Sequence, residues 1–309
     1  MKKLLNATVS LFIVGLIIFF FVRYITKNIA DFKKILLVSP FYIMLLTLTF
    51  LVTIWLSARM MDLMLRGFGL KLKKWENIGL VNITNFYNTI TPFRGGAAIR
   101  AIYLKKKYNF NFTGFLSVFP AVYIVLIVSG SILGILGLVL AKLFYNQFNL
   151  LIFLFLLSIT LLTLIIAFFI PKLSETKYSL LNKIIYIING WQIIKKNKSL
   201  MFKTTLIALM QFIFIAISYN LAYSSIGYKL PFIYAIIITS INSLALLIAI
   251  TPGNLGISEI INVFVANLIK IPVIESVLAM LIWRITNVLL ILLLGMPSTY
   301  LLLKFKKLS

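Results

Sequence analysis

The chain has 309 residues, of which 62% are hydrophobic and only 12% are charged, and it carries 30 lysine and arginine residues against 6 aspartate and glutamate residues. Soluble domains contain roughly 45–50% apolar and about 25% charged residues, so no soluble core could bury this many hydrophobic side chains. Cysteine and histidine are absent, which excludes disulfides, thiol nucleophiles, imidazole bases and His or Cys metal sites. We therefore expect an all-α polytopic integral membrane protein, without a cofactor and without a metal.

The net charge of +24 suggests that the protein contacts an anionic partner. Such a charge could indicate a nucleic-acid binder. However, the cations lie in short polar gaps between apolar runs, where anionic lipid headgroups are available. We expect membrane lipids with charged headgroups as partners, and no nucleic acid.

Six apolar runs are long enough to cross about 30 Å of hydrocarbon. The first follows Lys2 and Lys3 and resembles a signal peptide, but its apolar core is long and no small-residue cleavage site follows, so we expect an uncleaved span. Pro120 and Pro297 are expected to bend two of the runs. The runs are residues 4–22, 35–57, 112–141, 150–170, 201–224 and 277–303.

Two further apolar regions, residues 78–104 and 232–269, are interrupted by Pro and Gly, and we expect that no piece of either region crosses a bilayer alone. The apolar pieces are residues 78–90 and 97–104 in the first region, and 232–250 and 257–269 in the second. Irregular backbone at membrane depth survives only where protein or a water-filled cavity surrounds it. Each region therefore predicts a re-entrant helical hairpin with its tip near the midplane. The tip residues are Thr91, Pro92, Gly95 and Gly96 in the first hairpin, and Thr251, Pro252, Gly253 and Gly256 in the second.

The distribution of lysine and arginine predicts that both termini are cytoplasmic, because most of the 30 cations then lie on the cytoplasmic side. Residues 23–34 go against the positive-inside rule, because in this orientation their cations lie on the outer side of the membrane. The two hairpins then enter from opposite faces, as an inverted-topology repeat requires. We expect a single membrane domain, residues 1–309, made of a first half (1–171), a cytoplasmic interfacial amphipathic linker (172–200) and a second half (201–309).

Four charged residues are predicted to lie at membrane depth. A charge at a helix centre costs ~2.5–3.5 kcal/mol on insertion scales, so it usually faces a partner or a wet cavity. In one interpretation Glu259 pairs with an arginine and the other charges only fix the hairpins. In the other, the surplus positive charge binds a phosphate headgroup through arginine forks and the free N–H groups of helices that restart after the glycines. The candidate binding residues are Arg94, Arg100, Glu259, Arg284, Asn85, Asn88 and Asn254.

Three segments carry a family resemblance: Pro92 to Arg100, Pro252 to Glu259, and the Leu-Ile-Trp-Arg of residues 281–284. They resemble signature segments of the lysylphosphatidylglycerol synthase transmembrane family, whose flippase-like membrane domain also occurs as a stand-alone protein. The first segment has Ala97 where the family commonly has an acidic residue, which leaves Glu259 as the only acidic candidate. In bifunctional relatives a soluble domain aminoacylates phosphatidylglycerol. The chain ends six residues after residue 303, so we expect that domain to be absent and the chain not to be an enzyme.

The resemblance implies a flippase of the plasma membrane that moves an anionic or aminoacylated phospholipid, or a polyprenyl-phosphate-linked lipid, between leaflets. A separate lipid-modifying enzyme is a second candidate partner. The sequence contains no Walker nucleotide-binding loop, so the energy would come from a gradient, the membrane potential or downstream consumption, or the protein would act as a scramblase.

Two other classes of function stay open. A membrane-embedded glycosyl- or phosphotransferase acting on a lipid carrier would need a catalytic acid at the interface, and Asp62 and Glu76 form no paired-carboxylate motif. A non-transporting membrane assembly factor would need none of the buried charges.

Overall fold

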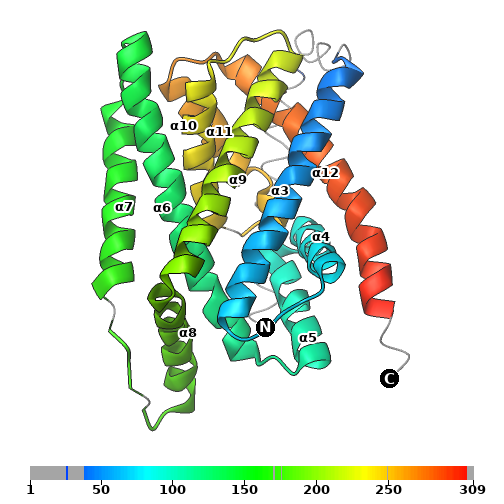
Figure 1. The fold of residues 1–309 in the computed structure, drawn as a ribbon. Coiled ribbons are helices and arrows are strands. Elements are labelled where there is room, and N and C mark those ends of the chain that lie inside the picture. The colour runs from blue at the N-terminus through cyan, green and yellow to red at the C-terminus, as the bar shows by residue number, and fades with distance from the viewer. Residues whose placement is uncertain (1–25, 27–37, 170, 175, 249, 305–309) are drawn as a thin grey trace.

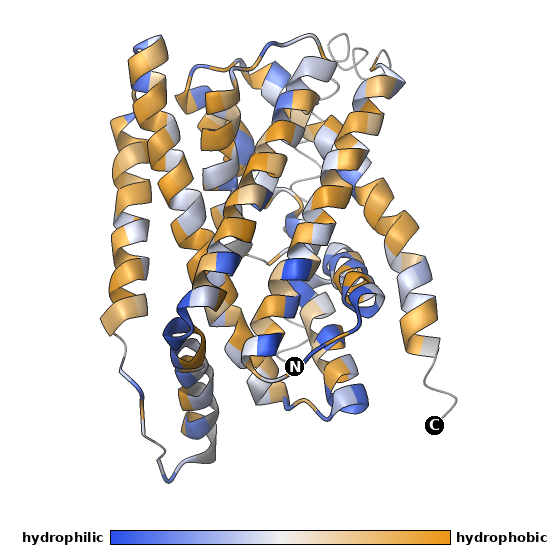
Figure 2. Ribbon diagram, viewed as in Figure 1, coloured by the Kyte–Doolittle hydropathy of each residue, from blue (hydrophilic) through white to orange (hydrophobic). Residues whose placement is uncertain are grey.

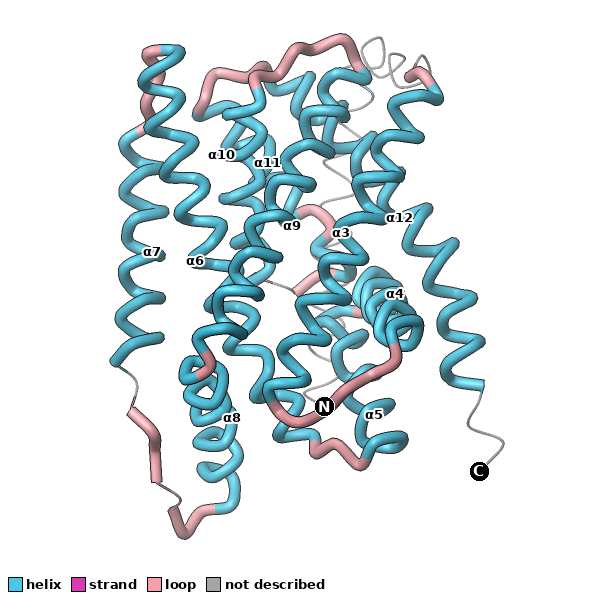
Figure 3. Tube along the Cα trace, in the orientation of Figure 1, coloured by secondary structure: helices cyan, strands magenta, loops and turns pink. Residues whose placement is uncertain are grey.

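The computed structural model describes residues 26, 38–169, 171–174, 176–248 and 250–304, and within these ranges the regular structure is entirely helical (Figure 3). This confirms the all-α fold expected from the composition. The predicted first span, residues 4–22, lies outside the described residues.

Five described helices are long and apolar enough to cross a membrane, and they run side by side along the molecule (Figure 1). Four of them match predicted runs to within a few residues at each end. The run predicted for residues 35–57 instead belongs to a helix that continues to Gly67, because Asp62 and Arg66 pair one turn apart at 2.9 Å and carry the helix past its apolar part. The helices are α3 (Pro40–Gly67), α6 (Phe112–Tyr145), α7 (Leu150–Phe169), α9 (Lys198–Ser225) and α12 (Val273–Lys304).

Local chemistry explains where several of these helices begin. α3 has a proline at its first position, and the Ser39 hydroxyl accepts a hydrogen bond from the backbone N–H of Phe41 at 3.3 Å. The Asn197 side chain caps α9 in the same way, accepting from the N–H of Leu200 at 3.0 Å. Pro120 and Pro297 lie inside α6 and α12.

The outer surface of the bundle is strongly apolar. On α7 large hydrophobic side chains face outward along the whole helix, from Leu151 to Phe169, which is 79% exposed. Figure 2 shows that hydrophobic residues dominate α6 and α7, whereas hydrophilic residues gather at the end that holds α5 and α8. An exposed apolar surface of this extent marks contact with lipid, and the protein is a membrane protein.

Two pairs of shorter helices form hairpins inside the bundle. The first hairpin comprises α4 (Lys74–Ile90), η2 (Pro92–Arg94) and α5 (Gly95–Tyr108). The second comprises α10 (Phe232–Asn242), η3 (Ser243–Leu247), η4 (Pro252–Asn254) and α11 (Ile257–Leu268). In Figure 1 the first lies in the lower half of the view and the second in the upper half, and α4 and η2 contact η4 where the halves meet.

The helix bounds in the hairpins differ from those predicted. The first hairpin extends beyond 78–104 at both ends, because Glu76 near the start of α4 pairs with Lys107 near the end of α5 at 2.9 Å. In the second, α10 ends at Asn242 rather than at residue 250. There the chain folds back over itself, since the Asn254 side chain donates to the carbonyl of Ala245 at 2.7 Å.

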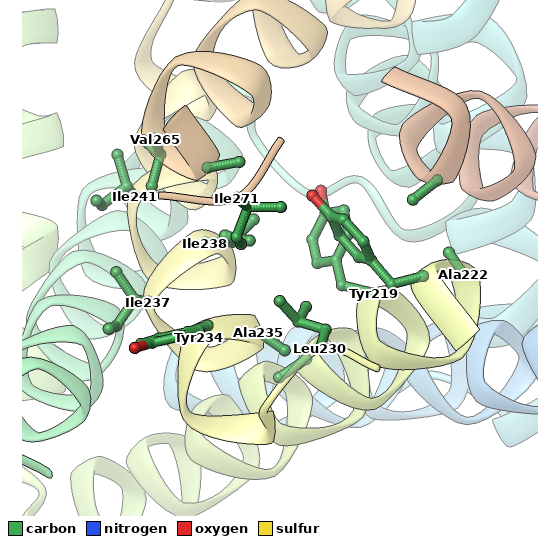
Figure 4. Packing of buried hydrophobic residues seen from close by; sticks show 14 of the residues in the cluster. Tyr219, Ala222, Leu230, Tyr234, Ala235, Ile237, Ile238, Ile241, Val265 and Ile271 are labelled. Carbon is green, nitrogen blue, oxygen red and sulfur yellow. The ribbon is translucent and has the colours of Figure 1, made fainter. Parts of the chain in front are cut away.

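Each hairpin has its own hydrophobic core. One core surrounds the second hairpin and includes Leu46, Tyr219, Ile238 and Ala266, part of which Figure 4 shows. The other surrounds the first hairpin and includes Met64, Leu80, Leu104, Phe115 and Trp191. The long helices α3, α6, α9 and α12 contribute to both cores and thereby fix one hairpin relative to the other.

The predicted amphipathic linker contains helix α8 (Ser179–Lys196). Its Gly190 packs against Ser117 of α6, and Ile185, Trp191 and Ile194 are buried. The Trp191 indole also donates to the carbonyl of Ala167 at 2.7 Å. Part of its apolar face therefore meets protein, and its contact with a membrane surface stays a prediction.

Candidate functional site

The second tip is a tight turn built on two glycines. Gly253 and Gly256 have φ of 56° and 84°, in the left-handed region that glycine adopts without a steric penalty. The Thr251 hydroxyl donates to the carbonyl of Leu255 at 2.9 Å and closes the turn. The predicted tip residues thus hold the backbone in place.

Glu259 lies just after the second tip, in the first turn of α11, and both of its carboxylate oxygens have partners. Its Oε2 accepts hydrogen bonds from the backbone N–H of Gly256 at 2.7 Å and from the Ser258 hydroxyl at 3.1 Å. Its Oε1 lies 3.4 Å from Nη1 of Arg284, whose Nη2 donates to the carbonyl of Gly253 at 2.7 Å. Glu259 and Arg284 therefore join α12 to the second tip, as the structural interpretation of these charges predicts.

The first tip is built differently. Phe93 and Arg94 adopt left-handed φ of 53° and 55° without being glycine, a conformation that costs about 1–3 kcal/mol where the surroundings impose it. The Arg94 guanidinium donates to the Tyr123 hydroxyl and lies 5.4 Å from the centre of the Tyr123 ring. Arg94 thus ties the first tip to α6.

Close backbone packing supports this tip. The N–H of Gly96 donates to the Asn88 side chain at 3.0 Å, and the Gly96 Cα approaches the Thr84 carbonyl so closely that a Cβ would collide with it. The Thr91 hydroxyl donates to the carbonyl of Tyr87 at 2.6 Å. Pro92 opens η2, and Gly95 starts α5.

The two tips touch each other in the middle of the bundle. A Cβ built on Gly253 would lie 3.3 Å from the Cα of Thr89 on α4, and 3.2 Å from Nη2 of Arg284. Arg284 thus lies beside the junction of the two hairpins. Since α5 and α11 both begin at the tips, the N-terminal ends of two helices point into this region, where their dipoles favour negative charge.

Arg100 is the most buried of the predicted charges. It is 4% exposed, and no carboxylate of the described residues forms an ion pair with it. Its Nε has no hydrogen-bond partner either. Burial removes hydration from this guanidinium, and the carboxylates of the described residues do not compensate its charge.

A separate polar cluster lies at the base of the first hairpin. Glu76 is 0% exposed and accepts hydrogen bonds from the hydroxyls of Tyr103 and Tyr108, both at 2.6 Å, and from Lys107 at 2.9 Å. Burial by itself raises the pKa of Glu76, but these bonds and the positive charge outweigh it and hold the pKa below its ordinary value of 4.5. Burial and the carboxylate raise the pKa of Tyr108 to about 12.

The predicted site residues are thus only partly brought together. Glu259, Arg284 and Gly253 are in direct contact, whereas Arg94 contacts Tyr123 and Arg100 lies deeper in α5. Asn88 and Asn254 bond to backbone near the tips, and Asn85 is half-buried on α4. Among the described residues, no group of three or more acidic side chains is placed to hold a metal ion.

Comparison with known proteins identifies one family. The model described as the lysylphosphatidylglycerol synthase TM region matches residues 7–295. No curated protein matches the chain. No solved structure matches it either.

Proposed function

The chain belongs to the lysylphosphatidylglycerol synthase transmembrane family, and from this premise we propose that it moves a lipid with an anionic headgroup between the two leaflets. The membrane region of this family is not itself the catalytic aminoacyltransferase. The phosphate, shared by phospholipids and polyprenyl-phosphate-linked lipids, is the group that the interior arginines would recognise.

The observation that carries this proposal is the surplus of positive charge in the interior. Glu259 is already paired with Arg284, while Arg100 is buried without a carboxylate among the described residues. Breaking or omitting one partner of a buried ion pair typically costs about 3–5 kcal/mol. A guanidinium retained at that cost is explained by an anion that binds there during the working cycle.

The geometry also suggests how a headgroup would pass. A lipid head cannot easily enter hydrocarbon, because each unsatisfied polar group costs several kcal/mol there. Arginine side chains and helix N-termini at the tips would replace its lost hydration. Alternating access requires the two tips, which meet at Gly253 and Thr89, to part toward one leaflet at a time.

The orientation in the membrane follows from the charges at the two ends of the bundle. The last turn of α5 carries Lys105 to Lys107 and the end of α8 carries Lys196, and we assign the end of the bundle where these two helices are found (Figure 1) to the cytoplasm. Cysteines introduced at Lys74 or Lys196 should be protected from an impermeant thiol reagent in intact cells. Those at Asn146, Tyr228 or Pro272 should be labelled, and labelling at position 196 would reverse the assignment.

Reconstituted vesicles test the function itself. Wild-type protein should move fluorescently labelled phosphatidylglycerol to the opposite leaflet faster than empty vesicles do, and faster than it moves labelled phosphatidylcholine. Arg94→Lys and Arg100→Lys should slow this movement, because an ammonium group cannot reproduce the planar fork of a guanidinium. Arg59→Lys, an exposed position on α3, is the matched control. Equal rates in wild-type and empty vesicles would contradict the proposal.

A further inference from the structure

Helix α8 leaves a groove between itself and the rest of the bundle, beside the lower end of α6 in Figure 1. Two cavities of about 350 and 310 Å³ lie along it, each within the size range of small-molecule sites. They adjoin, because Phe68, Gly114 and Tyr186 line both. The first cavity runs along α8, and the second reaches the turns that follow α3 and α5. The two cavities together are called the α8 groove below.

Small residues explain why α6 and α8 approach closely here and still leave space. The Ser117 hydroxyl donates to the carbonyl of Tyr186 at 3.0 Å, and Gly190 packs directly on Ser117. One turn earlier α6 has Gly114, where the nearest atom to an added Cβ would be one of the Phe110 ring at 3.4 Å. The lack of a side chain at Gly114 therefore leaves open the space that both cavities share.

The groove lies at the level where the apolar surface of α7 ends. Phe168 and Phe169 close that helix and are exposed. Lys195 of α8 donates to the carbonyl of Phe168 at 2.8 Å, and the Trp191 indole donates to the carbonyl of Ala167 at 2.7 Å. The end of α8 is therefore fixed beside the end of a membrane-spanning helix. This is the depth at which a bilayer places its headgroups and at which tryptophan is common.

Two lysines lie on the groove. Lys196 ends α8, and Lys172 lies in the connector between α7 and α8. Asn189 holds this connector, because its amide donates to the carbonyl of Leu173 at 2.9 Å and accepts from the N–H of Leu173 at 2.9 Å. Both lysines are exposed, and the described residues that line the groove include no carboxylate. An anion in the groove would therefore meet two ammonium groups without an acidic side chain to repel it.

The wall next to the lysines is largely apolar. Phe68, Ile185 and Ile193 line the first cavity, and Ile193 is exposed although it is hydrophobic. Apolar side chains beside ammonium groups suit an amphiphile that has an anionic head and an acyl chain. A free phosphate would use the lysines but would leave this wall uncovered.

We propose that the α8 groove binds one anionic phospholipid of the leaflet on that side of the membrane. Its phosphate lies between Lys172 and Lys196, and part of one acyl chain lies against Phe68 and Ile193. The lipid thereby joins α8 to the rest of the bundle. The predicted tip residues of the hairpins do not line this groove, so the proposal does not depend on lipid movement between leaflets.

A photoactivatable phosphatidylglycerol with a diazirine in one acyl chain tests the site in phosphatidylcholine vesicles. After illumination, peptide mapping should find adducts on α8 and at the start of α6, several-fold more than with the matching phosphatidylcholine probe. Lys172→Gln combined with Lys196→Gln should abolish this preference, because each lysine near a membrane surface favours an anionic headgroup by about five-fold. Lys177→Gln combined with Lys198→Gln is the matched control, since these exposed lysines line neither cavity.

Three outcomes of this labelling would overturn the proposal. They are equal labelling of the wild type by the two probes, an unchanged preference in the Lys172 and Lys196 double variant, and an equal loss of preference in the control. Gly114→Leu tests the cavity itself, because its side chain should fill the shared space and lower the labelling by both probes. Unchanged labelling of Gly114→Leu would contradict the placement of the acyl chain.

Thermal unfolding in detergent separates this site from the interior arginines. Added phosphatidylglycerol should raise the melting temperature of the wild type and of Arg100→Lys, and it should raise that of the Lys172 and Lys196 double variant less. A rise that depends on Arg100 but not on the two lysines would overturn the α8 site. Binding at α8 without any translocation in vesicles would contradict the flippase proposal and leave this site intact.

Discussion

The ion pair of the second hairpin lies at its tip, whereas the ion pair of the first lies at its base. At the second tip Glu259 and Arg284 join α11 and α12 to the Gly253 carbonyl. In the first hairpin the ionic contacts lie at the other end, where Glu76 and Lys107 join the start of α4 to the end of α5. The tip of the first hairpin carries Arg94 in a strained backbone conformation.

This difference suggests that the two tips are released by breaking different contacts. The first tip is joined to α6 by the contact of Arg94 with Tyr123. A tip fixed by an ion pair must first release that pair before the site can open. On the proposed function, Arg94 and Arg100 of the first hairpin would contact the headgroup, and the ion pair at the second tip would have to open.

The largest effect on stability should come from breaking the ion pair at the second tip. Arg284→Gln leaves Glu259 without its cation and should lower the free energy of unfolding by roughly 3–5 kcal/mol, the range for a broken buried pair. Thermal unfolding in detergent measures this change.

A double-mutant cycle provides the control for the ion pair. Glu259→Gln combined with Arg284→Gln should recover most of the lost stability, because no uncompensated charge is left. Glu259→Gln combined with Arg94→Gln should not, since the structure pairs Glu259 with Arg284 and not with Arg94. Equal recovery in both double variants would mean that the pairing is not specific.

The base of the first hairpin should show the next largest effect, with a defined pH dependence. Glu76→Gln weakens hydrogen bonds to a charged acceptor, each worth roughly 1.5–3 kcal/mol. Because the pKa of Glu76 is lower in the folded protein than its ordinary 4.5, the contribution is fully present above that value and is lost as pH falls toward the folded pKa. Unfolding measured from pH 7 downward should therefore show wild type and Glu76→Gln converging in acid. A difference that widens in acid would contradict this assignment.

Close packing at the first tip predicts a smaller effect. Gly96→Ala places a Cβ against the Thr84 carbonyl, which is backbone and cannot move aside, and overpacking of this kind costs about 1–3 kcal/mol. In Gly114→Ala the nearest atom to the new Cβ would be one of the Phe110 ring at 3.4 Å, an ordinary contact, so this helical glycine is the matched control. Thermal unfolding should distinguish the two variants, and equal melting temperatures would show that the first tip is less tightly packed than described.

The smallest effect is expected where Arg94 meets Tyr123. Tyr123→Phe removes the hydroxyl that accepts from Arg94 but leaves the ring beneath the guanidinium, so stability should fall by about 1 kcal/mol or less. Tyr186→Phe, an exposed tyrosine of α8, should have no effect in the same assay. A loss as large as that of Arg284→Gln would remove the contrast between the two tips.

Much of the fold could be predicted from hydrophobic runs and their interruptions. Uninterrupted apolar segments became α6, α7, α9 and α12, and the Pro-Gly segments became the hairpin tips. Helix ends that carry charge were predicted less well. Glu76 and Lys107 are far apart in the chain, and only the folded hairpin brings them together to extend α4 and α5.

The candidate site stays a prediction as a binding site, and its contacts could not be predicted from the sequence. Glu259 stands out as a carboxylate in an apolar region, yet three arginines were possible partners, and the packing of α11 on α12 selects Arg284. Tyr123, which contacts Arg94, was not singled out. An aromatic or amide side chain within an apolar helix carries no sign of which face it occupies, so its role emerges only from the tertiary structure.

The contact between the tips offers the most direct test of the account, because the chain has no natural cysteine. A Cβ on Gly253 would lie 3.3 Å from the Cα of Thr89, close enough for a disulfide between Thr89→Cys and Gly253→Cys. If the tips must part for a headgroup to pass, oxidation of the double variant should stop the translocation of labelled phosphatidylglycerol and reduction should restore it, while each single variant should ignore the oxidant. Translocation by the cross-linked protein at the rate of its reduced form would contradict the account.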